Sequence, residues 1–298
     1  MANQRANGEG SHIEPLPGTV KEEAPERYAL WAMKASIIIA TVVVSAFALY
    51  GVGLAGFYDL PYALSILPFR GRALTEGLIV TLTLIAMVLP VGFILGFAFG
   101  WARAAGSRPL RVLSTAYVEF FRGMPPIVLI AFAFLITIVL FKDNPRIDDP
   151  FAFAVQISVF ALAGHSGAYQ AEIIRAGILS VPTGQIEAGE AIGLSRGGIL
   201  GRIIMPQMFR VSLPALGNEF ASVIKDTSLL SAVGALDLVF QGKNLGARLV
   251  TTGGNIALVF ILWGVIAVVY LIVTSVVTRS LQMIEKRYRV PGLEAAQL

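Results

Sequence analysis

Six ionisable side chains lie in or near long apolar stretches of this sequence. They are Glu119, Arg122, His165, Glu172, Lys225 and Asp226. Moving one such group into a bilayer costs about 3 kcal/mol, so these residues usually face a cavity or a partner. A small zwitterion, carrying an ammonium group and a carboxylate, would need both an anionic and a cationic partner before it could leave water. Glu119 or Asp226 could receive its ammonium group. Lys225 or Arg122 could receive its carboxylate.

Each of these groups also has a purely structural interpretation. Lys225 and Asp226 could neutralise one another or, because Thr227 and Ser228 follow them, line a polar path, and the sequence leaves both open. Glu172 and Arg175 are three residues apart, which is the spacing of an ordinary ion pair on a helix. For His165, helix packing is a simpler explanation than contact with a substrate.

Catalysis by this chain finds little support in the sequence. Gly164-His165-Ser166-Gly167 has the form of a serine-nucleophile motif, but the serine would need a histidine from another span, and the only other one is His12 in a polar tail. We therefore reject an intramembrane serine protease. There are no cysteines, which excludes thiolate sites, and no P-loop stretch that would hold nucleotide. We expect no catalytic residue, no metal site and no cofactor here.

The composition is that of a membrane protein. Apolar residues make up 56% of the chain and charged residues only 14%, and the mean hydropathy is +0.74. A soluble domain carries about 25% charged residues. A pI near 9.4 would suit nucleic acid, but the basic residues lie in short segments between apolar ones. Orientation in a membrane explains them better, so no nucleic-acid partner is expected.

The apolar segments predict an all-α, polytopic membrane protein with six transmembrane helices. Residues 1–34 are predicted to be a disordered tail and 290–298 a second tail. No cleavage site follows the first apolar segment, so it is expected to be a retained helix. Pro61, Pro68 and the basic residues at 70–72 mark a loop after it. The expected spans lie at 35–56, 75–101, 112–141, 151–174, 209–236 and 255–279.

Prolines and glycines are expected to affect the shape and packing of these spans. Pro125-Pro126 and Pro214 are expected to kink or interrupt their helices. Gly92, Gly96 and Gly100 are four residues apart, a spacing that lets helix backbones approach closely. That contact could join two chains or pack one chain internally, and internal packing is the safer prediction.

Both termini, the 102–111 loop and the segment after residue 174 can be assigned to one face of the membrane. That face then carries most of the 23 Lys and Arg residues. The positive-inside rule makes that face cytoplasmic. A polar segment, EAGEAIGLSRGGILGRIIMP at 187–206, then lies in the cytosol. Pro182 and Thr183 give a helix-start signal and Gly193 a stop, which predicts a helix of about two turns. It is too short to span a bilayer, so it must lie against the membrane or a partner.

This segment resembles the EAA loop of ABC importer permeases, the membrane subunits of ATP-driven importers. The family pattern is Glu-Ala-Ala, three residues, Gly, nine residues, Ile, any residue, Leu-Pro. Here Gly189 replaces the second Ala and Met205 the Leu, and the other positions agree. The resemblance implies a coupling helix at 183–198 that contacts a separate ATPase. The coupling residues would be Glu187, Ala188, Gly189, Gly193, Leu194 and Pro206.

Three further stretches resemble the branch of that family that carries polar amino acids of the histidine, glutamine, glutamate and arginine type. They begin at Tyr117, Gly167 and Leu213. The branch implies a five-helix core within 70–289, to which the 35–56 helix is additional. Leu129 and Met124 depart from residues common in the branch, which leaves the substrate open. The substrate path would include Glu119, Arg122, His165, Tyr169, Lys225, Asp226, Thr227 and Ser228.

The resemblance also implies partners and a location. We expect an ATP-binding subunit holding ATP and Mg, an extracytoplasmic substrate-binding protein, and a second permease, either another copy or a related chain. The complex would lie in a prokaryotic inner membrane with both termini of this multi-pass chain cytoplasmic. The alternative is a secondary amino acid carrier or channel working alone. That alternative would leave the EAA helix without a partner.

Overall fold

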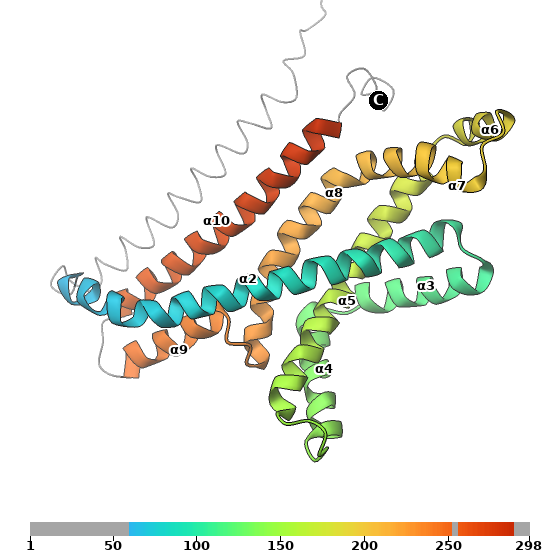
Figure 1. Cartoon of the computed structure of the whole chain (residues 1–298). Coiled ribbons are helices and arrows are strands. Elements are labelled where there is room, and N and C mark those ends of the chain that lie inside the picture. The colour runs from blue at the N-terminus through green and yellow to red at the C-terminus, as the bar shows by residue number, and fades with distance from the viewer. Residues whose placement is uncertain (1–59, 252–255, 289–298) are drawn as a thin grey trace, which may run out of the picture. The chain divides into compact units, whose positions relative to one another are not determined.

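The computed structural model describes residues 60–251 and 256–288, and all its regular elements there are helices (Figure 1). The prediction of an all-α protein is confirmed for this part of the chain. The predicted 1–34 tail, the additional helix at 35–56 and the 290–298 tail lie outside the described residues.

The first described helix, α2 (Leu60–Ala105), is 46 residues long. The prediction of a loop around Pro61, Pro68 and 70–72 is therefore wrong, because the helix runs through all of them. Pro61 lies in the first turn, where its missing N–H breaks no helical hydrogen bond. Gly71–Ala105 has a mean hydropathy of 2.7, which suits a membrane span.

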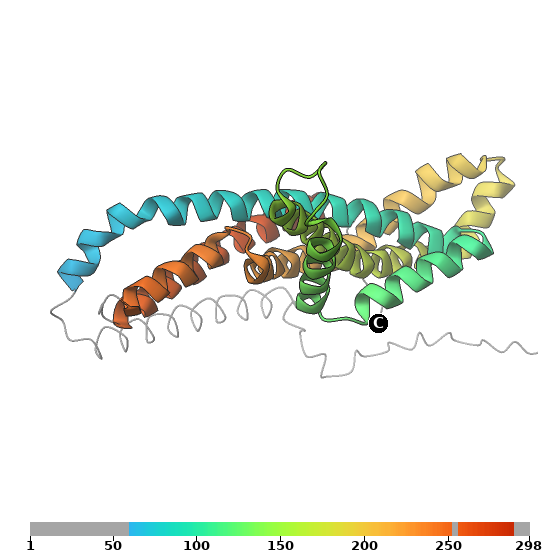
Figure 2. The ribbon, with the colours of Figure 1, turned by 90° about the horizontal axis from the view of Figure 1, so that it is seen from below.

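The predicted span at 112–141 is two helices, α3 (Arg108–Arg122) and α4 (Pro126–Phe141), bent by 101°. The expected interruption at Pro125-Pro126 is therefore confirmed. Residues that precede a proline are disfavoured in helical conformation, and Pro125 has the extended φ of −60° and ψ of 136°. Figure 2 shows the two helices meeting at this sharp corner.

The middle of the chain carries α5 (Pro150–Leu179), α6 (Thr183–Ala191), α7 (Arg196–Ile199), a π-helical turn η2 (Leu200–Ile204) and α8 (Met205–Asp226). The short helix predicted after Pro182 is confirmed as α6. Pro214 lies inside α8 without interrupting it, contrary to one of the two predicted outcomes. Neighbouring helices often let a membrane helix tolerate a proline in this way.

The end of the chain differs more from the prediction. The expected span at 209–236 is α8 followed by a 3₁₀ helix, η3 (Thr227–Val233). A further helix, α9 (Leu238–Thr251), occupies a predicted loop, and α10 (Ile256–Tyr288) follows. In the described part of the chain, three helices are long and apolar enough to cross a membrane, or four if α3 and α4 form one bent span. A polytopic membrane protein is confirmed, but a count of six spans is not.

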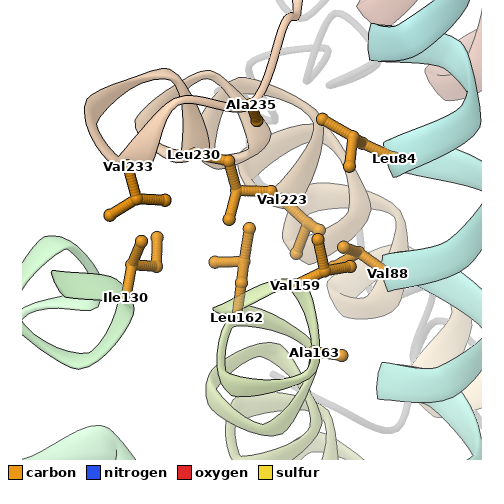
Figure 3. Close-up of a cluster of buried hydrophobic side chains, with 10 residues drawn as sticks. All are labelled: Leu84, Val88, Ile130, Val159, Leu162, Ala163, Val223, Leu230, Val233 and Ala235. Atoms are coloured by element: carbon orange, nitrogen blue, oxygen red, sulfur yellow. The ribbon is translucent and has the colours of Figure 1, made fainter. Parts of the chain in front are cut away.

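The core centres on α5, which packs against α2, α3, α4 and α8. Figure 3 shows side chains from α2, α4, α5, α8 and η3 pointing toward one another. Val88, Ile130, Leu162 and Leu230 are fully buried within it. Because η3 contributes to this cluster, the tight turn that ends α8 is held in the same core as the spans.

The contact between α2 and α5 is unusually close. A Cβ atom at Gly96 would lie 2.5 Å from the Gln170 Cβ, and one at Gly100 would lie 2.5 Å from the Ala171 carbonyl oxygen. A Cβ at Gly92 would lie 3.2 Å from the Ala163 oxygen. The three glycines thus pack helices of one chain, as the sequence favoured.

Candidate functional site

The short helix α6 ends in a turn that requires glycine. The Gly193 N–H donates to the Glu190 oxygen at 2.9 Å, and the Leu194 N–H donates to the Gly189 oxygen at 3.0 Å. These two bonds form a Schellman motif, whose left-handed residue is Gly193 with a φ of +80°. The motif therefore has glycine at this position because of its backbone conformation, in which any other residue would be strained.

The inner side of α6 is attached to the start of α8. Gly189 is buried, and a Cβ there would lie 2.6 Å from the Ile203 Cδ1. The Gln207 Nε2 donates to the Gln185 Oε1 at 2.5 Å and to the Ile203 oxygen at 2.9 Å. Because the second Ala of the family pattern is Gly here, Ile203 can approach the helix closely. The Ile203 side chain occupies the space that an alanine methyl group at position 189 would need.

The outer side of α6 is exposed. Glu187, Ala188 and Glu190 point away from the core, and the Ile192 side chain at the helix end is 78% exposed. Leu194 is half-buried behind the turn, and Pro206 is exposed in the first turn of α8. An apolar side chain beside two carboxylates, on a helix fixed from behind, is suited to contact another protein.

A second group of polar residues lies on α3, α5 and α8, where α5 packs against both of the other helices. The Arg122 guanidinium carbon is 5.1 Å from the centre of the Tyr169 ring, within cation–π range, and the His165 and Tyr169 rings are 5.1 Å apart. Arg122 and Asp226 are both close enough to Glu219 to act on it electrostatically. Arg122 and the two rings thus lie in contact, and the carboxylates of Glu219 and Asp226 lie within electrostatic range of each other.

Sequence reasoning missed Glu219. It belongs to none of the quoted motifs, but it precedes Asp226 by seven residues on α8. That spacing is about two helical turns and puts both carboxylates on one helix face. The spacing alone could have found it.

Other predicted path residues do not join this group. Lys225 is exposed, and the Thr227 and Ser228 hydroxyls donate to backbone oxygens of Ile224 and Lys225 at 2.7 and 2.6 Å. The Glu119 side chain is 68% exposed.

Glu172 and Arg175 form the predicted ion pair, with the Arg175 Nε 3.0 Å from the Glu172 Oε1. Among the described residues, no group of three or more His, Asp or Glu side chains could hold a metal ion.

Comparison with known proteins supports one family. Residues 89–290 match the model of the "binding-protein-dependent transport system inner membrane component" family. The L-cystine transport system permease protein TcyB of Bacillus subtilis is 37% identical over 214 residues, covering 72% of this chain and 86% of that protein. The glutamine transport system permease protein GlnP of Escherichia coli K12 is 36% identical, covering 73% of this chain and 93% of that protein.

Solved structures agree with this relationship. An amino acid ABC transporter crystallised with histidines superposes with a TM-score of 0.61 at 29% identity, covering 75% of this chain and 97% of that one. The MetNI methionine transporter, at 20% identity and a TM-score of 0.57, shares the fold. The chain therefore belongs to the family of inner-membrane components of binding-protein-dependent transport systems.

Proposed function

We propose that this chain is the permease subunit of an ABC importer for polar amino acids. The observation that carries the proposal is α6, whose outer side is exposed while its inner side is fixed to α8 and continuous with α5. Relatives named for cystine, glutamine and arginine transport support the substrate class. A carrier working alone would give α6 no partner, which disfavours that alternative.

Coupling would work through the two attachments of α6. Closure of an ATP-binding subunit on ATP would push on the Glu187–Leu194 surface. Val181, in the connection from α5, is buried, and Gln185 is hydrogen-bonded to Gln207 at the start of α8. A push on α6 would therefore reach both α5 and α8, the helices that carry the polar group around Arg122.

That polar group is our candidate for the substrate path. Arg122 would receive the carboxylate of the amino acid, and Glu219 and Asp226 its ammonium group. The rings of His165 and Tyr169 would form a wall beside them. Charges of both signs in one place are what a zwitterion requires in order to leave water. Glu119, Lys225, Thr227 and Ser228 are weaker candidates because of their exposure or their local hydrogen bonds.

The remaining partners follow from the same proposal. The family description names a binding protein, which would deliver substrate at the face opposite α6. ATP and Mg would be held by the ATP-binding subunit and not by this chain. Two permeases, either two copies or this chain with a related one, would enclose the path. Both termini would be cytoplasmic.

The proposal is tested by reconstituting the chain in liposomes with the ATP-binding subunit and binding protein from its gene neighbourhood. We expect uptake of at least one of glutamine, cystine, arginine and histidine that depends on ATP and on both partners. Uptake by this chain without the ATP-binding subunit would refute the proposal and support a carrier.

The variant Gly193→Asp in the same liposomes tests the role of α6. We expect it to lower the amino acid taken up per ATP hydrolysed, because the left-handed turn that ends α6 is strained by any side chain and a charge then stands on the docking surface. Gly201→Asp is the control, since a side chain at Gly201 meets open space and the residue lies in η2, outside the 183–198 segment. Unchanged coupling in Gly193→Asp would show that α6 does not transmit the ATPase cycle.

A further inference from the structure

One carboxylate, Glu172 of α5, lies among three arginines that come from three helices. Its Oε2 is 2.5 Å from the Arg103 Nη1 of α2 and 4.0 Å from the Arg122 Nη1 of α3. Its Oε1 is 2.5 Å from the Arg175 Nη2 of α5 itself. The Arg103 side chain is only 13% exposed and that of Glu172 28% exposed. This ion-pair group is thus partly shielded from solvent, where charge interactions are stronger than at an open surface.

The arrangement argues against Glu172 as a substrate contact. Both of its oxygens already accept hydrogen bonds from arginines. Three guanidinium groups around it would also repel the ammonium group of an arriving amino acid. A carboxylate whose oxygens are satisfied by arginines of neighbouring helices acts as a connection between those helices.

The position of Glu172 makes that connection relevant to coupling. Seven residues separate it from the end of α5 at Leu179, about 10 Å of helix, and α6 begins shortly after. On the side of Glu172 away from α6, α2 and α5 are already in close contact at Gly96 and Gly100 and cannot move closer together. The Arg103–Glu172 pair continues this interface toward α6. Arg122, the third partner, also stacks on Tyr169 of the candidate substrate path.

We propose that Glu172 is a positioning residue that makes α2, α3 and α5 follow the movement of α6. Through Arg103 it carries that movement to α2, and through Arg122 it carries the movement to α3. This inference rests on the proposed function, because it assigns Glu172 a part in the coupling of ATP hydrolysis to transport.

The test uses the full complex in proteoliposomes, with Glu172→Gln, Glu172→Asp and Arg103→Gln measured beside wild type. Glutamine keeps the size of the side chain and removes its charge. We expect Glu172→Gln to lower the number of amino acid molecules imported per ATP about tenfold, with KM for the amino acid within twofold of wild type. Glu172→Asp should recover part of the loss, because it restores the charge on a shorter side chain.

Two controls separate positioning from other roles. Glu76→Gln removes an exposed carboxylate of α2, paired with Arg72 at 2.9 Å, and should leave coupling unchanged. Arg103→Gln should lower coupling as Glu172→Gln does. The double variant should lose less coupling than the two single losses combined, because both single variants break the same Arg103–Glu172 pair.

Several results would overturn the inference. A large rise in KM with normal coupling would make Glu172 a substrate contact. Full coupling in Glu172→Gln, or a loss that merely parallels a lower melting temperature of the complex, would also contradict it. If wild type shows no ATP-dependent uptake, the proposed function itself fails, and the inference fails with it. The wild-type measurement therefore distinguishes the two failures.

Discussion

Replacing Gly100 by alanine tests how tightly α2 and α5 are packed. The new Cβ would lie 2.5 Å from the Ala171 oxygen and 3.1 Å from the Ile174 Cβ. An ordinary contact between carbon and a carbonyl oxygen is about 3.3 Å or longer, so the helices must separate by roughly 0.8 Å. Overpacking of this kind costs about 1–3 kcal/mol. Alanine gains about 0.5–1 kcal/mol over glycine in a helix, which offsets only part of that cost.

The assay is thermal unfolding of the purified protein in detergent, with Gly71→Ala as the matched control. Gly71 lies in the same helix, but a Cβ there meets nothing within 4 Å. A change of 1 kcal/mol shifts the melting temperature of a domain this size by about 2–4 °C. We expect Gly100→Ala to melt a few degrees lower than wild type and Gly71→Ala to melt no lower. Equal melting temperatures for Gly100→Ala and wild type would show that α2 and α5 are not locked together.

Two further substitutions probe local geometry. Gly189→Ala should leave coupling close to wild type, because its Cβ would be too close only to the flexible Cδ1 end of Ile203 and would make ordinary contacts with Ile199 and Leu194. Gly189→Leu should displace Ile203 and lower transport per ATP. Equal transport by both variants would contradict the packing of α6 on η2. Asp237 is fully buried, and its Oδ1 accepts from the Phe240 N–H at 2.7 Å at the start of α9. Asp237→Ala should therefore lower the free energy of unfolding by about 1 kcal/mol or more, measured as a lower melting temperature. Asp237→Asn should retain most of the cap. Asp143→Ala, at an exposed position, is the control and should leave the melting temperature unchanged.

The sequence predicted those elements whose signals are local. The bounds of α6 were predictable because its start after Pro182 and its stop at Gly193 depend on residues within one turn of each end. The same holds for the break between α3 and α4, which two adjacent prolines cause. Gly100 and its two companions could be assigned to close packing from their spacing alone.

Features that depend on distant contacts could not be predicted. Helix α9 contains Gly242 and Gly246, which weaken a helix in isolation. Both glycines are buried and face side chains of α10. Its stability comes from that packing and not from its own sequence. The long α2 likewise continues through Pro61 and Pro68, which the local rules read as a loop.

The candidate site could likewise be predicted only in part, because some of its contacts join residues that are distant in the sequence. Arg122, His165 and Tyr169 were named from their motifs, and the structure brings them together. Glu219 belongs to no motif, and only its seven-residue spacing from Asp226 on α8 could have indicated it; its electrostatic interaction with Arg122, on another helix, is not visible in the sequence. Thr227 and Ser228 were named for their hydroxyls, but those hydroxyls bond to the preceding turn, which a sequence does not reveal.

The central claim is that the exposed side of α6 contacts an ATP-binding subunit. Because the chain has no cysteine, Ile192→Cys can carry a single benzophenone crosslinker, and Asp143→Cys at an exposed position in the α4–α5 connection is its control. In the assembled complex, we expect illumination to join position 192, and not position 143, to the ATP-binding subunit. No adduct at 192, or an equal adduct at 143, would contradict the account.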